Sequence, residues 1–169
     1  MELRGIKALV VGLGRTGEAV CDFLIQQGAE VKISEKSRPE NLGKRIRFWQ
    51  EKGVEVETGS HKLQSFLDAD LIIPSPGVPY IPQLEEARKK GREIHSEIEL
   101  AYRFLRGKIV GITGTNGKST TATLTHKILQ EGGLQSHLAG NIGTPLIRFV
   151  EKSQPDDLFV TELSSFQLR

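Results

Sequence analysis

Residues 111–120, GITGTNGKST, combine glycine, lysine and hydroxyl side chains in the manner of a phosphate-binding loop. The common loop places four residues between its first glycine and the Gly-Lys pair, but here Ile112 holds that first position. The glycines fall instead at Gly111, Gly114 and Gly117. Backbone N–H groups of such a loop can surround phosphate oxygens, Lys118 can neutralise the β- and γ-phosphates, and Ser119 or Thr120 can ligate Mg²⁺. We therefore interpret the stretch as a nucleoside triphosphate site rather than an incidental glycine-rich turn.

A nucleoside triphosphate site also needs an acidic residue near Mg²⁺, and such acids stand at the ends of buried strands. Residues 157–162, DLFVTE, form an apolar run that ends at Glu162. We interpret Glu162 as the magnesium ligand; the alternative is a solvent-facing glutamate at a strand edge. Four histidines show no metal-ligand spacing, so we expect them to be surface or packing residues: His61, His95, His126 and His137.

A second glycine motif, GLGRTG, lies at residues 12–17 between an apolar run and a helical stretch. Its spacing is that of a dinucleotide-binding turn, in which glycines allow close backbone approach and a helix N-terminus holds a phosphate. Glu35 follows about 20 residues later, at the place of the acid that contacts a ribose. Taken alone, the motif suggests NAD, although it specifies a phosphate-containing ligand better than it specifies which one; a glycine turn without a ligand is the alternative.

Short apolar runs and helical stretches alternate along the chain, and they must position these motifs. We expect N-terminal strands at residues 7–12, 30–34, 54–58 and 69–75, with helices at 17–28, 40–53 and 82–91. After a linker helix, the alternation restarts with a strand at 108–113, a helix at 118–131 and a strand at 157–162. The pattern predicts an α/β protein, with a Rossmann-like parallel-sheet domain at 1–95, the linker helix at 96–106 and part of an ATP-binding, phosphate-loop α/β domain at 107–169.

Composition excludes several classes of protein. The chain has 169 residues and a net charge of +2 with acids and bases interspersed, which gives no basic surface for nucleic acid. The single cysteine, Cys21, excludes an internal disulfide framework and fits a reducing compartment. No apolar run approaches the ~20 residues that a membrane span requires. We expect a cytoplasmic monomer.

Five segments together resemble one enzyme family. GITGTNGKST is similar to the ATP loop of the Mur ligases and folylpolyglutamate synthases, which departs from the common loop in the same way. Four further segments resemble the Mur ligases that add D-glutamate: GLGRTG, SPGVP at 75–79, GNIGTP at 140–145 and ELSSFQL at 162–168. The resemblance spans nearly the whole chain in the right order, and ELSSFQL with GNIG is its most specific part.

The resemblance implies a use for each site. The first domain would bind the UDP of a muramoyl substrate rather than NAD, and the second would bind ATP and Mg²⁺. The implied UDP-substrate contacts are Gly14, Arg15, Thr16, Glu35, Lys36, Ser75, Pro76, Gly77, Asn141, Ser164 and Gln167. The implied ATP-binding residues are Gly114, Thr115, Asn116, Gly117, Lys118, Ser119 and Thr120. The implied metal ligands are Ser119, Thr120 and Glu162, and the implied catalytic residues are Lys118, Asn141 and Glu162.

The implied reaction joins D-glutamate to UDP-N-acetylmuramoyl-L-alanine through an acyl phosphate, in the synthesis of peptidoglycan precursors. Members of the family are far longer than 169 residues, so we expect this chain to be an N-terminal fragment that lacks the D-glutamate site and is inactive alone. A stand-alone UDP-sugar-binding or regulatory module is one alternative. An NAD-dependent oxidoreductase is another, but it leaves SPGVP and ELSSFQL without a role.

Overall fold

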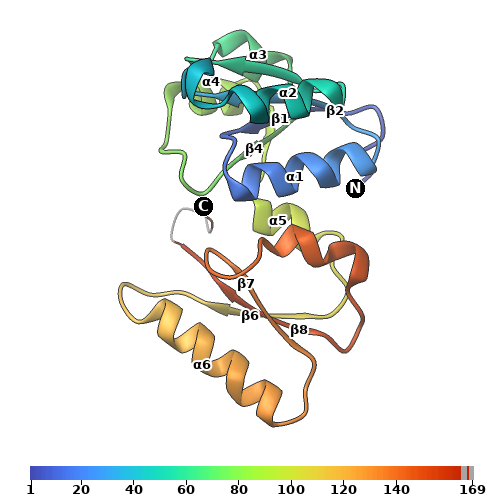
Figure 1. Cartoon of the computed structure of the whole chain (residues 1–169), viewed down its shortest axis with the longest axis vertical. Helices are drawn as coiled ribbons and strands as arrows, with labels where there is room; N and C mark the ends of the chain where they lie inside the picture. The colour runs from blue at the N-terminus through green and yellow to red at the C-terminus, as the bar shows by residue number, and fades with distance from the viewer. Residues whose placement is uncertain (165–166, 168–169) are drawn as a thin grey trace. The chain divides into compact units, whose positions relative to one another are not determined.

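The computed structural model describes residues 1–164 and residue 167. The chain forms two compact units, Met1–His95 and Ser96–Arg169, each with its own sheet (Figure 1). The segment expected as a linker helix falls within the second unit, where α5 (Glu97–Tyr102) packs against the helical turn η2 (Leu146–Lys152). No helix among the described residues is both long enough and apolar enough to cross a membrane.

The first unit is built on a five-stranded parallel sheet with the order β3-β2-β1-β4-β5. Its strands are β1 (Lys7–Val11), β2 (Glu30–Glu35), β3 (Glu55–Thr58), β4 (Leu71–Pro74) and β5 (Glu93–Ile94). Its helices are α1 (Arg15–Gln26), η1 (Pro39–Asn41), α2 (Gly43–Glu51), α3 (Leu63–Asp68) and α4 (Pro82–Lys89). The order reverses at β1, between β2 and β4, and ligands of open α/β sheets bind at the carboxyl ends of the strands beside such a reversal.

Apolar side chains cover both faces of this sheet. One cluster joins it to α3 and α4: Leu9, Val11, Phe66, Ala69, Ile72, Leu84 and Ala87. Ala8 and Val10 point to the opposite face by strand alternation and are also buried. A strand buried on both faces reads as a continuous apolar run, which is why KALVV is recognisable in the sequence.

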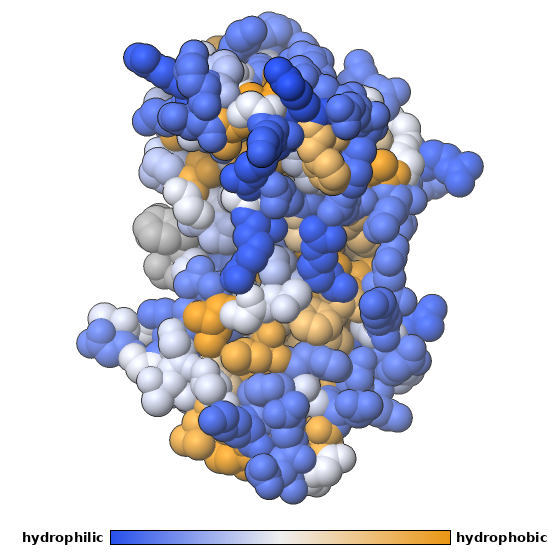
Figure 2. Space-filling view, viewed as in Figure 1, coloured by the Kyte–Doolittle hydropathy of each residue, from blue (hydrophilic) through white to orange (hydrophobic). Residues whose placement is uncertain are grey.

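The second unit has a three-stranded parallel sheet with the order β6-β8-β7. The strands are β6 (Lys108–Ile112), β7 (Ser136–Gly140) and β8 (Leu158–Glu162), and α6 (Lys118–Glu131) packs on β7 and β8. Ala122 of α6 is fully buried, whereas Leu124 and Ile128 are more than half exposed. Figure 2 shows hydrophobic surface on this unit. The described residues therefore leave one apolar side of α6 uncovered.

The prediction of an α/β protein with parallel sheets is confirmed, and several elements differ in detail. The stretch expected as one helix at 40–53 is divided into η1 and α2, and Phe48 on α2 is half exposed. Four elements were not predicted: α3, β5, β7 and η2. β5 has only two residues and α3 only six, so the apolar spacing that marks longer elements has little room to develop in them.

Candidate nucleotide sites

The first candidate site is the turn between β1 and α1. Gly14 stands at the N-cap of α1, and no side chain caps the helix. The first N–H groups of a helix have no partner within the helix, and together with its dipole they attract an anion. Arg15 and Thr16 occupy the first turn of α1, so the sequence places a cation beside these N–H groups.

Glycine is required in this turn by close packing. A Cβ on Gly17 would lie 2.1 Å from the carbonyl oxygen of Gly12, which no side chain can tolerate. Ser75 donates a 3.1 Å hydrogen bond from its Oγ to the same carbonyl, which ties the SPG segment after β4 to the glycine turn. Gly14 differs, because a Cβ there would meet nothing within 4 Å and its φ of −90° suits any residue. The fold does not explain a glycine at this position, but close approach of a ligand to the backbone would.

Glu35 holds the glycine turn in place. Its carboxylate accepts hydrogen bonds from the Leu13 N–H at 2.6 Å and the Ser37 N–H at 2.8 Å. Partial burial alone would raise the pKa of Glu35, but these bonds outweigh burial and the pKa is lowered, so the carboxylate is ionised at neutral pH. An ionised carboxylate has about four lone-pair positions, so Glu35 retains acceptor capacity for a ligand.

The remaining residues predicted for the UDP site in the first unit stand at the same edge of the sheet. Lys36 follows β2 directly, and the segment 75–77 follows β4 directly. Sequence reasoning missed Arg45, which pairs with Glu18 at 2.8 Å and donates to the Leu13 carbonyl. Arg45 lies on α2, some 30 positions from the turn, and no local motif marks it.

The second candidate site is the loop between β6 and α6. Gly117 is the N-cap of α6 and has a φ of +76°, a left-handed conformation that favours glycine. The Lys118 ammonium donates to the Gly114 carbonyl at 2.8 Å, so its charge lies across the loop. The residues between them, Thr115 and Asn116, are exposed, as is Thr120 on the first turn of the helix. A loop of this form presents backbone N–H groups and one cation to a phosphate chain.

Glu162 brings three separate segments together beside this loop. Its side chain is 2% exposed and ends β8. Ser119 donates from Oγ to one carboxylate oxygen at 2.6 Å, and Asn141 donates from Nδ2 to the other at 3.0 Å. Asn141 directly follows β7, a strand that the sequence did not reveal. The structure thus assembles the three side chains from α6, β7 and β8.

The oxygen atoms in this cluster fit Mg²⁺, which prefers hard oxygen ligands and keeps several waters. Glu162 would supply the carboxylate, and Ser119 is the hydroxyl in contact with it. No group of three or more His, Cys, Asp or Glu side chains suited to a metal occurs among residues 1–164 and 167. One carboxylate and one hydroxyl suit a metal whose other ligands are waters and nucleotide phosphates.

Ser164 and Gln167 form a small turn after β8. The Ser164 N–H and Oγ both donate to Oε1 of Gln167, at 2.8 and 2.9 Å. The Gln167 Nε2 is buried and has no hydrogen-bond partner among the described residues. A buried donor without a partner costs free energy, so this amide is suited to meet an acceptor on a ligand. Other residues of the ELSSFQL motif, 165, 166 and 168, lie outside the described residues.

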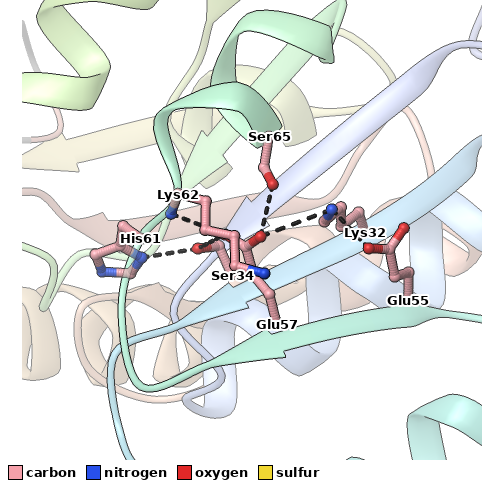
Figure 3. Close-up of polar contacts among 7 residues, drawn as sticks. All are labelled: Lys32, Ser34, Glu55, Glu57, His61, Lys62 and Ser65. Atoms are coloured by element: carbon pink, nitrogen blue, oxygen red, sulfur yellow. Dashed lines mark hydrogen bonds and ion pairs between the residues drawn. The ribbon is translucent and has the colours of Figure 1, made fainter.

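A polar cluster that sequence reasoning missed lies at the ends of β2 and β3 (Figure 3). Glu57 is 7% exposed and accepts hydrogen bonds from Ser34 and Ser65, both at 2.6 Å. His61 contacts the Ser34 Oγ through Nδ1 at 2.8 Å. No motif marks the cluster, because its members come from two strands, a loop and the helix α3. His61, expected to be a surface or packing residue, also takes part in a hydrogen-bonded chain with Ser34 and Glu57.

Comparisons with known proteins match both parts of the chain to one family. Residues 6–96 match the family model of the Mur ligase MurD-like N-terminal domain, and residues 112–169 match the Mur ligase middle domain. The UDP-N-acetylmuramoylalanine–D-glutamate ligase of Koribacter versatilis (strain Ellin345) is 48% identical, and that of Desulfatibacillum aliphaticivorans is 42% identical. Each match covers 99% of this chain, which spans 37% and 38% of the two relatives.

A solved structure shows the same architecture. The pseudomurein peptide ligase type C from Methanothermus fervidus is 25% identical, with a TM-score of 0.52. The similarity covers 94% of this chain and 33% of that one. With a family model that matches more than half of its residues, the chain belongs to the Mur ligase family, in its MurD-like branch.

Proposed function

We propose that this chain supplies the UDP-substrate site and the ATP site of a ligase that joins D-glutamate to UDP-N-acetylmuramoyl-L-alanine. The relatives at 42–48% identity carry the name of that activity. The chain spans little more than a third of their length, and the activity in their names is that of the whole proteins. The cytoplasmic location and the monomeric state stay predictions.

In the proposed reaction, a carboxylate oxygen of the L-alanine attacks the γ-phosphorus of ATP, and ADP leaves. The amine of D-glutamate then attacks the carbonyl carbon of the acyl phosphate. Inorganic phosphate leaves, the nitrogen loses its proton, and an amide remains. Phosphate is a far better leaving group than oxide, which is why the carboxylate must first be phosphorylated.

The chain's own residues would act mainly by charge and position. Lys118 would move from the Gly114 carbonyl to the phosphates and stabilise the charge of the transferring group. Bound Mg²⁺ would neutralise the β- and γ-phosphate oxygens. Glu162 would hold the metal with Ser119, and Asn141 would then have its amide free for the γ-phosphate or the substrate carboxylate.

One observation carries this proposal: Ser119, Asn141 and Glu162 meet at one point beside the phosphate loop. They come from the three segments whose sequences GKST, GNIG and ELSS resemble the family. A glycine-rich turn without a ligand would not require a buried acid at its edge. A carboxylate with a serine hydroxyl at 2.6 Å is instead the pair that a magnesium nucleotide needs.

A chimera tests the proposal. Residues 1–169 would replace the matching third of the Koribacter versatilis relative, and phosphate release would be measured with ATP, Mg²⁺, D-glutamate and UDP-N-acetylmuramoyl-L-alanine. We expect release that requires all four, and loss of release in Lys118→Ala. Thermal unfolding and UDP binding would show that the chimera is folded. A folded chimera that binds UDP but has equal activity with and without Lys118 would contradict the assignment of the loop.

A further inference from the structure

In the polar cluster around Glu57, the donor and the acceptor of each hydrogen bond can be assigned. Burial alone would raise the pKa of Glu57, but bonds from Ser34, Ser65 and the Lys62 N–H, with the Lys32 ammonium 3.6 Å away, lower it. The carboxylate is therefore ionised and can only accept hydrogen bonds. The short Ser34–Glu57 contact must then use the single hydroxyl hydrogen of Ser34.

This direction sets the tautomer of His61. With its hydrogen donated to Glu57, the Ser34 Oγ can only accept from His61, so the ring must carry a hydrogen on Nδ1. The other nitrogen of a neutral ring, Nε2, is then an acceptor. It makes no hydrogen bond to the described residues. Gln83 donates to the His61 carbonyl at 2.9 Å and holds the backbone of the loop.

His61 lies at the edge of the first unit's sheet where the strands have their carboxyl ends, the edge that carries the candidate UDP site. β3 pairs with β2 in parallel, with Glu35 opposite Thr58, and the Gly59 N–H donates to the Ser37 carbonyl at 3.1 Å. Glu35 and Lys36 both act electrostatically on the His61 ring. A nucleotide with its phosphates at a glycine turn after β1 extends its nucleoside to the end of β2. The nucleoside half would therefore lie beside His61.

We propose that His61 binds the nucleoside of the UDP substrate, with Nε2 accepting a hydrogen bond from uridine. The donor is the uracil N3–H or a ribose hydroxyl. Phosphate oxygens are excluded as the partner, because an acceptor needs a donor opposite it. The inference rests on the proposed UDP site and adds a residue that selects the nucleoside, with Ser34 and Glu57 as positioning residues behind it.

Calorimetric titration of the 169-residue chain with UDP tests the role of His61. His61→Phe keeps a ring near Phe66, whose centroid lies 6.1 Å from the His61 ring, but it removes the acceptor. We expect UDP affinity to fall roughly three- to tenfold, the value of one hydrogen bond. His61→Gln can place an amide oxygen near the position of Nε2 and should restore most of the affinity. Inorganic pyrophosphate, which lacks a nucleoside, should bind all three proteins equally.

Two serines provide a matched pair of variants. Ser34→Ala and Ser65→Ala each remove one hydroxyl bond to Glu57, but only Ser34 contacts His61. Ser34→Ala should weaken UDP binding severalfold, and Ser65→Ala should leave it unchanged at equal thermal stability. Equal effects of the two changes would mean that the cluster acts only on the fold.

The source of the donor can be identified with altered ligands. N3-methyl-UDP lacks the imide hydrogen, and 2′-deoxy-UDP and 3′-deoxy-UDP each lack one ribose hydroxyl. The ligand without the donor to His61 should bind wild type and His61→Phe equally. If His61→Phe weakens all three ligands as much as it weakens UDP, no single nucleoside donor meets Nε2 and the proposal is wrong.

Protonation of the ring gives a further readout. Burial and then Lys36 hold the pKa of His61 below its usual range, against the opposing effects of Glu35 and Glu57. Protonation turns Nε2 into a donor, so UDP affinity should fall as the pH falls through that pKa. The pKa values of Glu35 and Glu57 are also lowered, which favours their ionised forms, and the pKa of Lys32 is raised, which favours its charged form. The phosphate of UDP titrates equally with wild type and with His61→Gln. The difference between their two curves of UDP affinity against pH therefore reports the protonation of the His61 ring.

The outcomes separate this inference from the proposed function. A wild-type chain that does not bind UDP would overturn both. A chain that binds UDP with equal affinity in wild type, His61→Phe and Ser34→Ala would overturn the role of His61 and leave the UDP site in place.

Discussion

Glu162 is a buried acid that accepts hydrogen bonds from a hydroxyl and an amide, and these two contacts indicate the role of its carboxylate. Ser119 and Asn141 both donate to it, so the carboxylate organises the loop before any nucleotide binds. The Glu162 carboxylate would also contribute one negative charge to the binding of Mg²⁺. These two roles can be separated, because glutamine keeps one acceptor oxygen and the shape of the side chain but removes the charge.

We predict that Glu162→Gln in the chimera lowers turnover about 10²–10³-fold and raises the Mg²⁺ concentration needed for half-maximal rate. Steady-state phosphate release over a range of Mg²⁺ concentrations measures both effects. Glu151→Gln, an exposed change on η2, is the control. An unchanged Mg²⁺ requirement would remove Glu162 from the metal site.

Gly14 offers a second test at the scale of one residue, because nothing in the fold requires glycine there. Gly14→Ala should change the free energy of unfolding by no more than ~1 kcal/mol, the effect of an N-cap change. It should weaken UDP binding by about tenfold or more, since a methyl group would stand where the phosphate approaches. Gly17→Ala, which collides with the Gly12 carbonyl, should instead destabilise the fold. Thermal unfolding and calorimetry on the same samples distinguish the two, and normal UDP binding by Gly14→Ala would place the phosphate elsewhere.

At the scale of elements, the sequence predicted long and strongly apolar segments well. KALVV and DLFVTE are mostly apolar runs that were predicted as strands and contain β1 and β8, and α6 begins at Lys118 as the loop motif predicts. β7 was missed because SHLAG carries a histidine and small residues without alternation. Its strand conformation depends on its parallel pairing with β8 rather than on its own sequence pattern. Asn141 could still be singled out by resemblance, although the strand that positions it could not.

The polar cluster around Glu57 was missed for a different reason. Ser34, Glu57, His61 and Ser65 lie in four segments, which are β2, β3, the loop after β3 and α3, and each has an ordinary role when read alone. Only the parallel pairing of β2 with β3 places Ser34 beside Glu57. Contacts of this kind depend on tertiary structure, and periodicity or local motifs cannot show them.

Glu97 joins two elements of the second unit and gives a prediction about pH. Its side chain is 2% exposed, and it accepts the Ile147 N–H at 2.7 Å at the start of η2. Burial raises the pKa of Glu97 to about 7, against the smaller lowering effect of the Ile147 and Leu146 N–H groups. The folded state therefore holds a proton that the unfolded state, with an ordinary carboxyl pKa, has already released.

We predict that the second unit is most stable at acidic pH and loses up to about 3 kcal/mol as the pH rises from 4.5 through 7. Hydrogen exchange of residues 97–152 at pH 5.5 and pH 8, corrected for intrinsic rates, measures the loss. Glu97→Gln should flatten this dependence, whereas Glu99→Gln on the exposed side of the same helix should keep it. An equal loss in Glu97→Gln would assign the effect to another group.

At the scale of the whole molecule, the two nucleotide sites belong to two units. Each unit has its own sheet, and each site lies at the carboxyl ends of the strands of that sheet. The sites should therefore respond separately to substitution.

We predict that Lys118→Ala leaves the affinity of the 169-residue chain for UDP unchanged within about twofold, the range of a distant and independent site. The same change should abolish phosphate release in the chimera. Calorimetric titration of wild type and variant with UDP makes the comparison. A parallel loss of UDP affinity would show that the two units share one site.

We propose that the first unit binds the UDP of a ligase substrate and not a nicotinamide dinucleotide, although its glycine turn has the dinucleotide spacing. Calorimetric titration of the 169-residue chain with UDP and with NAD under identical conditions tests this most directly. We predict saturable binding of UDP at one site and much weaker binding of NAD. Tighter binding of NAD would contradict it.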